Sequence, residues 1–340
     1  MSVDPNPSNT VLSVHDLKVS FATRQGEVRA VDGLSLEVGQ REVLGIVGES
    51  GSGKSVAMYS MLGLVRDANA SITGSVRFEG KEILGLADKD MQSIRGGDIG
   101  MIFQDPMTAL TPVYTVGWQI VEQIRAHTDM TKPQAKERAI ELLAEVGIPD
   151  PRTRVNHYPH EFSGGMRQRV VIAMALSCNP KLLIADEPTT ALDVTTQAQI
   201  LSLMSRLQET HGSSIVIITH DMGVIAEMAH RVVVMYAGRP AEIGPEIDVV
   251  RSPRHPYTWG LLGAVPRAGT RSQRLATIPG NAISPLDVPV GCAFAPRCEY
   301  RMAICVERPL MKGADGHQDA CWLSDEQRIT IRSSVGRGTS

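Results

Sequence analysis

A stretch near the N-terminal end, residues 44–55, combines glycine, lysine and serine at a spacing that suits phosphate chemistry. It reads LGIVGESGSGKS and matches the phosphate-binding pattern G-x-x-x-x-G-K-S/T at every fixed position. Its glycines allow a tight turn whose N–H groups form an anion nest at the start of a helix. The alternative is a chance turn, but an apolar run precedes the motif and a helix-like start follows it. The residues assigned to a nucleoside triphosphate are Gly48, Ser50, Gly51, Ser52, Gly53, Lys54 and Ser55.

Two carboxylates end a second apolar run, Lys181 to Ala185. Asp186 has the position of a carboxylate that binds Mg²⁺ together with the Ser55 hydroxyl. Glu187 follows directly and could polarise an attacking water as a general base. Alone, such a pair often marks only a strand that meets a turn. Downstream of a complete phosphate loop, it predicts hydrolysis of the triphosphate.

A second anion nest is predicted at Ser163, Gly164 and Gly165, where Ser-Gly-Gly opens a helix. Helix capping by Ser163 is the simpler explanation. Capping alone does not explain a second nest between the phosphate loop and the Asp-Glu pair. We therefore assign these three residues to nucleotide binding as well.

These motifs resemble those of the ATP-binding cassette (ABC) ATPases. SGGMRQR, LLIADEPTTALD and IVIITHD carry the resemblance, which extends from about Val11 to Gly244. It implies that Gln104 contacts Mg²⁺ and the attacking water, and that His220 contacts the γ-phosphate. It also implies that Asp193 lies at a dimer seam, while Phe21 is a candidate to stack on adenine and is equally well explained as a core residue.

The resemblance further implies that two subunits share each ATP, with Ser163 to Gly165 completing the site of the opposite subunit. The second ATPase could be a different chain or a copy of this one. Since Lys54, Asp186, Glu187 and His220 are all present, hydrolysis is expected rather than nucleotide sensing alone.

The C-terminal part resembles the tail of oligopeptide/dipeptide-type importer ATPases. The similarity lies in SPRHPYT from Ser252, AVPR from Ala264 and GCAFAPRC from Gly291. Ala109 and Thr111 depart from the DPMTSLNP form that is common among relatives. The resemblance implies a transmembrane permease docked around Gln104 to Trp118, and an extracytoplasmic solute-binding protein. Nickel importers share this subfamily, so cargo stays open; a soluble ABC ATPase of DNA repair or translation is the competing class.

Four cysteines follow position 290, spaced C-x₅-C-x₆-C-x₁₅-C. Zinc ribbons usually contain C-x₂₋₄-C pairs, so the spacing favours another group. Four thiolates on loop-rich backbone suit an iron–sulfur cluster, and the subfamily resemblance implies [4Fe–4S] with a structural role. Zinc and four buried thiols without metal remain as alternatives. The candidate ligands are Cys292, Cys298, Cys305 and Cys321.

The elements that position these residues follow from hydrophobic periodicity. Hydrophobic alternation predicts strands that turn at Gln25-Gly26 and Asp32-Gly33, and further strands at 74–79 and 99–103. Together these strands are expected to form an antiparallel layer beside the phosphate-loop strand. Helical spacing predicts helices at 131–147, 163–177 and 193–210, the first two in a helical insert of about 105–180. The runs at 181–185 and 214–218 are typical of buried parallel strands. The sequence thus predicts an α/β fold with a P-loop NTPase core, an antiparallel β-subdomain and a helical subdomain.

Composition sets the remaining limits. The 340 residues divide into a nucleotide-binding domain, 11–245, and a loop-rich, cysteine-containing extension, 246–330. A net charge of −3 gives no reason to expect nucleic-acid binding. No apolar run is long enough to span a bilayer, and the N-terminus lacks a signal pattern. We therefore expect a peripheral protein at the cytoplasmic face of the inner or plasma membrane.

Overall fold

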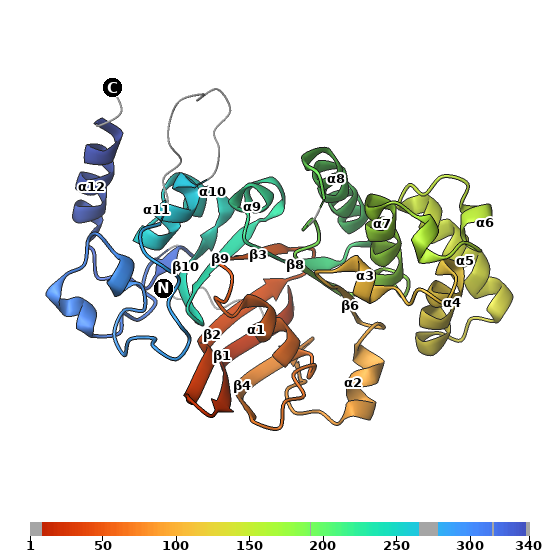
Figure 1. Cartoon of the computed structure of the whole chain (residues 1–340), viewed down its shortest axis with the longest axis horizontal. Coiled ribbons are helices and arrows are strands. Elements are labelled where there is room, and N and C mark those ends of the chain that lie inside the picture. The colour runs from red at the N-terminus through yellow and green to blue at the C-terminus, as the bar shows by residue number, and fades with distance from the viewer. Residues whose placement is uncertain (1–8, 191, 265–277, 315, 338–340) are drawn as a thin grey trace.

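Two β-sheets and a helical region organise the chain, as the computed structural model in Figure 1 shows. The structure describes residues 9–190, 192–264, 278–314 and 316–337. Within these ranges, no helix combines the length and the apolar character needed to cross a bilayer.

The larger sheet has seven strands in the order β11-β10-β9-β3-β8-β7-β6. From β9 to β6 the strands are parallel, whereas β10 and β11 pair antiparallel at one edge. Every residue of β3, β7 and β8 is buried, which explains why their sequences are continuous apolar runs. The bounds are β3 Val43–Val47, β6 Ile99–Ile102, β7 Leu182–Asp186, β8 Ser214–Thr219, β9 Arg231–Tyr236, β10 Arg239–Pro245 and β11 Gln318–Asp319.

The second sheet is antiparallel, in the order β2-β1-β4-β5. Its strands are β1 Thr10–Thr23, β2 Gly26–Gly39, β4 Ala70–Phe78 and β5 Lys81–Glu82. The predicted layer is thus present, with two differences. Asp32-Gly33 lies inside β2 at an irregularity of the β1–β2 register, where Gly33 has φ +86°, and forms no turn. The strand at 99–102 pairs parallel with β7 and belongs to the larger sheet.

Helices follow the phosphate-loop strand and fill the predicted insert. Thr131 and Gln134 form a capping box at the start of the predicted helix at 131–147, which spans Lys132–Glu145. Figure 1 places this helical region at one end of the molecule. The bounds are α1 Lys54–Met61, α2 Asp88–Ile94, α3 Pro106–Ala109, α4 Val116–His127, α5 Lys132–Glu145, α6 Pro151–Arg154, α7 Gly164–Ala175, α8 Val194–His211 and α9 Met222–Met228.

The C-terminal extension lies at the opposite end in Figure 1 and packs on the larger sheet. Its strand β11 pairs with β10, so the extension contributes to the sheet of the nucleotide-binding part. Its helices are α10 Glu246–Arg251, α11 Pro256–Gly263 and α12 Asp325–Arg337, with 3₁₀ turns at Ala295–Arg297 and Ala303–Val306. Of the AVPR motif, only Ala264 is among the described residues.

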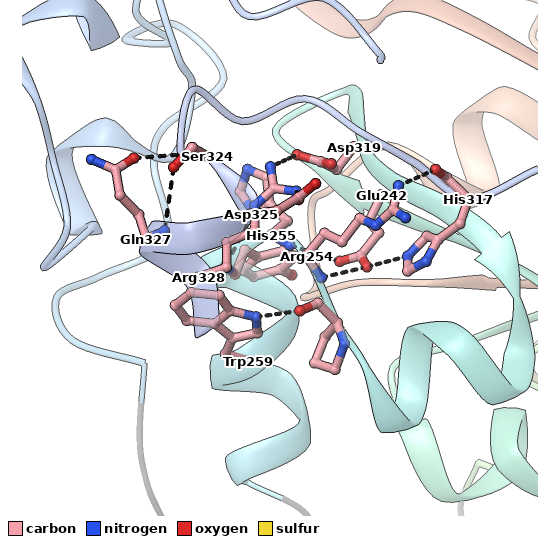
Figure 2. A network of polar contacts seen from close by, with 12 residues as sticks. Glu242, Arg254, His255, Trp259, His317, Asp319, Ser324, Asp325, Gln327 and Arg328 are labelled. Atoms are coloured by element: carbon pink, nitrogen blue, oxygen red, sulfur yellow. Dashed lines mark hydrogen bonds and ion pairs between the residues drawn. The ribbon is translucent and has the colours of Figure 1, made fainter. Parts of the chain in front are cut away.

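A buried polar network fixes the extension to β10 (Figure 2). The Glu242 carboxylate, with no exposed surface, accepts hydrogen bonds from the backbone N–H groups of Arg254 and His255 at 2.7 and 3.0 Å. It also lies 2.7 Å from His317 Nε2. Nearby, Arg328 of α12 donates to the buried Asp319 at 2.6 Å. These contacts tie three segments of the extension to one edge of the sheet.

Candidate functional site

The phosphate loop connects β3 to α1, and close backbone approach explains its glycines. Gly53 has φ +94°, and a Cβ there would collide with the carbonyl oxygen of Ala30. A Cβ on Gly48 would collide with the carbonyl oxygen of Met235. Gly51 and Ser50 are exposed at the loop tip, while Ser52 is buried. The loop therefore offers its backbone to solvent while both ends are held by neighbouring strands.

Lys54 lies folded over this loop. Its Nζ donates to the carbonyl oxygens of Gly48 and Glu49 at 2.7 and 2.9 Å and contacts Ser52 Oγ at 3.3 Å. The residue is only 5% exposed, and this burial lowers the pKa of its ammonium group, against the raising effect of Glu187, Asp186 and Glu49. The ammonium group therefore lies beside the loop, and it can bind the oxygens of a phosphate when it exchanges contacts with the loop carbonyls for contacts with the phosphate.

Asp186 ends β7 beneath the same loop. Its two carboxylate oxygens accept hydrogen bonds from Ser55 Oγ at 3.0 Å and from the Tyr59 hydroxyl at 2.8 Å. Burial raises the pKa of this carboxyl group, although both hydrogen bonds act to lower it. Mg²⁺ prefers hard oxygen ligands, and the Ser55 hydroxyl beside a carboxylate is a donor set of that kind. The predicted pair is therefore brought together in a form that suits Mg²⁺.

Glu187 lies at the centre of a polar cluster. Its carboxylate accepts from Gln104 Nε2 at 3.0 Å and Thr190 Oγ1 at 2.8 Å, and lies 3.1 Å from His220 Nδ1. Partial burial acts to raise the pKa of Glu187, but the contacts with Thr190 and His220 outweigh it and lower the pKa. The carboxylate is therefore ionised at neutral pH and can accept a proton.

The backbone of Glu187 is also unusual. Its φ of +47° is in the left-handed region, which a residue with a side chain adopts at a cost of about 1–2 kcal/mol. Its N–H donates to the carbonyl oxygen of Ile218 in β8 at 2.8 Å, which holds the turn. Strain of this kind is concentrated at functional sites. The turn directs the carboxylate toward residues from three different segments.

Other predicted nucleotide residues lie elsewhere in the single chain. Ser163 caps α7 by accepting from Met166 N at 3.3 Å, and α7 is well separated from α1 in Figure 1. Ser163 and Gly164 are exposed, and Gly165 is half-buried. Asp193 caps α8 through Thr196, whose hydrogen bonds lower the pKa of the carboxyl group. Phe21 is half-buried on β1 and packs against the core of the antiparallel sheet.

Two partners of the predicted carboxylates were not expected from the sequence. Tyr59 lies four residues after Ser55, so the spacing of one helical turn places both on the face toward Asp186. That spacing is a usable signal once Asp186 is assigned. Thr190, three residues after Glu187, bonds back to it across a turn. Both residues orient the carboxylates that the sequence does identify.

The four cysteines of the extension line one small cavity, together with residues that include Phe294 and Tyr300. None of them forms a disulfide. Burial, and then the nearby thiols, raise the pKa of Cys298 to about 12. Across the described residues, however, no group of three or more His, Cys, Asp or Glu side chains is arranged to hold a metal ion. The four thiols therefore line one cavity but are not arranged as a metal site. This arrangement does not support the predicted iron–sulfur cluster.

The fold and the nucleotide site together define an ATPase of the ABC transporter class. The chain matches the ABC transporter family over residues 31–190 and the C-terminal region of oligopeptide/dipeptide transporters over residues 241–305. A solved relative is MJ0796, an ATP-binding cassette seen as a dimer bound to ADP and Pi. It is 27% identical with a TM-score of 0.62, covering 69% of this chain and 98% of its own.

Relatives with higher identity narrow the class. The dipeptide transport ATP-binding protein DppD of Bacillus subtilis is 51% identical over 93% of this chain and 96% of its own length. The oligopeptide transport ATP-binding protein OppD of Salmonella typhimurium is 49% identical over 96% of this chain and 97% of its own. The chain belongs to this family of oligopeptide/dipeptide transport ATP-binding proteins.

Proposed function

We propose that this chain hydrolyses ATP to drive import of dipeptides or oligopeptides through a separate transmembrane permease. The observation that carries the proposal is near-50% identity to DppD and OppD over more than nine-tenths of both chains. The identity includes the extension as well as the nucleotide-binding part. We retain the division into residues 11–245 and 246–330 as part of this proposal.

Each residue of the site has a role in this reaction. Lys54 and the loop N–H groups bind the β- and γ-phosphates. Ser55, Asp186 and Gln104 would hold Mg²⁺, which would neutralise phosphate charge. A water oxygen attacks the γ-phosphorus, Glu187 accepts the water proton, and the bond to the β-phosphate oxygen breaks. His220 contacts the γ-phosphate. For Gln104 and His220 to do this, each must exchange its contact with Glu187 for one with the bound nucleotide.

A second subunit completes the site. Ser163 to Gly165 form a helix start on the part of the chain remote from α1, so they serve the nucleotide of a facing subunit. Asp193 lies at the seam, and Phe21 stacks on adenine. The dimeric state of the related cassette MJ0796 supports this arrangement. The facing ATPase is a different chain in a heterodimer or a copy of this one.

The permease docks on the helical region near Gln104. Large apolar side chains are exposed there, with Phe103 39%, Val113 71% and Trp118 41% accessible. Tyr114 stacks on Trp118 with ring centroids 4.0 Å apart. Exposed apolar side chains gathered in one segment are typical of a protein interface. This docking places the chain at the cytoplasmic face of the membrane, with an extracytoplasmic solute-binding protein supplying the peptide.

The four cysteines hold a [4Fe–4S] cluster in this proposal. What supports it is the donor set: Cys292, Cys298, Cys305 and Cys321 face one cavity and form no disulfide. A single zinc, about 2.3 Å from each sulfur, requires thiols packed more closely than a four-iron cluster does. Anaerobically purified protein is expected to contain about four irons per chain. Stoichiometric zinc without iron would exclude the cluster.

Affinity purification followed by transport separates the possible functions. Tagged full-length chain should recover hydrophobic permease subunits, and the assembled transporter should take up labelled peptides in an ATP-dependent manner. Glu187→Gln serves as the inactive control. Recovery of ribosomes or DNA in place of permease would contradict a transport role. Uptake of nickel without peptide uptake would keep transport and exclude peptide as the cargo.

A further inference from the structure

Glu49, in the phosphate loop, contacts the C-terminal extension through both its side chain and its backbone. Arg297 donates to both carboxylate oxygens of Glu49, from Nη1 to Oε2 at 2.6 Å and from Nη2 to Oε1 at 3.1 Å. The Arg297 side chain is 6% exposed and that of Glu49 is 29% exposed. A bidentate pair of this kind fixes orientation as well as distance.

The backbone of Glu49 is also held by the extension. Its N–H donates to the hydroxyl oxygen of Tyr257, in α11, at 2.7 Å. Tyr257 has no exposed surface and packs edge-on against Tyr236 with ring centroids 4.7 Å apart. The hydroxyl is therefore presented by a rigid aromatic group. The Glu49 N–H is used by this contact, so the anion nest is formed by the residues that follow it.

Arg297 itself is held independently of the loop. Its Nε donates to the carbonyl oxygen of Pro279 at 2.8 Å, and its guanidinium lies over the Tyr236 ring at 5.9 Å. It is the last residue of the 3₁₀ turn Ala295–Arg297 and directly precedes Cys298. The guanidinium is therefore placed by the extension and offered to the loop as a preformed partner.

We propose that Arg297 and Tyr257 are positioning residues for ATP binding, which hold the phosphate loop in its binding geometry through Glu49. The same residue contacts the binding lysine, since the Glu49 carbonyl oxygen accepts from Lys54 Nζ at 2.9 Å. Fixing Glu49 thus fixes both the first turn of the loop and the resting position of Lys54. This role goes beyond hydrolysis and transport, and it assigns the extension a part in nucleotide affinity.

The test compares the full-length chain with Arg297→Gln, Arg297→Lys and Glu49→Gln, and measures equilibrium MgATP binding with steady-state hydrolysis. A loop that is less well held loses contacts in ground state and transition state alike, which raises KM and leaves kcat unchanged. We expect Arg297→Gln to raise Kd and KM about tenfold, with kcat within twofold. Arg297→Lys, which keeps the charge and one contact, should be intermediate. The double variant Arg297→Gln with Glu49→Gln should bind ATP with the same Kd as Arg297→Gln alone, because both changes remove the same contact.

Arg308→Gln is the matched control. Arg308 also joins the extension to the core, through Asp32 Oδ2 at 3.0 Å and the Asp32 carbonyl oxygen at 2.8 Å, but does not contact the phosphate loop. It should lower thermal stability without changing Kd. Equal Kd values for the wild type and Arg297→Gln, or equal effects of Arg297→Gln and Arg308→Gln, would overturn the proposal.

The proposal can be tested even if Arg297→Gln does not fold. Tyr257→Phe and Glu49→Gln then replace it, because both preserve side-chain shape. An unchanged Kd in both variants would overturn the proposal. Iron and zinc are counted in every variant, and peptide uptake is measured separately. A chain that binds no iron or transports no peptide would contradict the proposed function. The comparison of Kd values would still decide whether Arg297 and Tyr257 position the phosphate loop.

Discussion

Replacing Glu242 with glutamine tests how the extension is attached to the sheet. The carboxylate uses Oε1 for Arg254 N and His317 Nε2, and Oε2 for His255 N, with all three contacts in the buried network of Figure 2. An amide that keeps its oxygen at the Oε1 position directs its NH₂ group at the N–H of His255. That backbone donor then has no acceptor.

The expected loss of stability follows from these contacts. One buried donor left without an acceptor costs about 1–3 kcal/mol. The two remaining hydrogen bonds change from charge-assisted to neutral, which loses about 1 kcal/mol for each bond. The neutral amide is easier to bury than the carboxylate, which offsets part of this loss. We expect a net decrease of about 3 kcal/mol in the free energy of unfolding. For a chain of this size, it corresponds to a fall in Tm of about 5 °C.

Hydrogen exchange locates the effect, and urea unfolding measures its size. In Glu242→Gln, amide protection should fall in β11 and at His255 more than in β3. Glu326→Gln, an exposed position on α12, is the control and should change stability by less than about 0.5 kcal/mol. If Glu242→Gln is as mild as the control, or if protection falls equally in β3, the inference that this carboxylate attaches the extension is wrong.

Three further outcomes follow from other parts of the structure. Glu187→Gln removes the proton acceptor, so ATPase activity should fall by about 10²–10⁴-fold and an ATP-bound dimer should accumulate on size-exclusion chromatography. Burial lowers the pKa of His255 to about 4, so between about pH 6.5 and 4 the unfolded state binds more protons than the folded state, and stability falls as the pH decreases through that window. His255→Asn, whose side chain can still accept a hydrogen bond from the Tyr257 N–H, should lose this part of the acid sensitivity when unfolding is measured against pH. Trp118→Glu places a charge on the exposed aromatic surface, so recovery of permease should fall by at least tenfold in pull-downs while ATP binding is retained.

Local patterns predicted the elements that carry the nucleotide chemistry. The phosphate loop, the buried strands before Asp186 and His220, and the capped helix at 132–145 all depend on contacts within a few residues. These signals are contained in a short window of sequence, so periodicity and capping rules detect them.

The features that escaped prediction depend on partners far along the chain. Asp32-Gly33 has the composition of a turn but lies within a strand, where Arg239 and Arg308 hold the Asp32 carboxylate. The prediction that the strand at 99–102 belongs to the antiparallel layer is wrong, because its parallel pairing with β7 spans more than 80 residues and leaves no local signal. The contact of Arg297 with Glu49 spans 248 residues, and neither residue has a local signal for it.

That long separation has a consequence for synthesis of the protein. Domains fold largely from the N-terminal end as the chain leaves the ribosome at about 5–20 residues per second. The phosphate loop therefore emerges roughly 12–50 s before the arginine that holds it, 248 residues later. Strand β11, which completes one edge of the larger sheet, emerges later still. A nascent chain thus has an unsupported phosphate loop for most of its synthesis, and an unpaired β10 edge from the emergence of β10 until β11 follows. Premature release in this period would yield an incomplete ATPase.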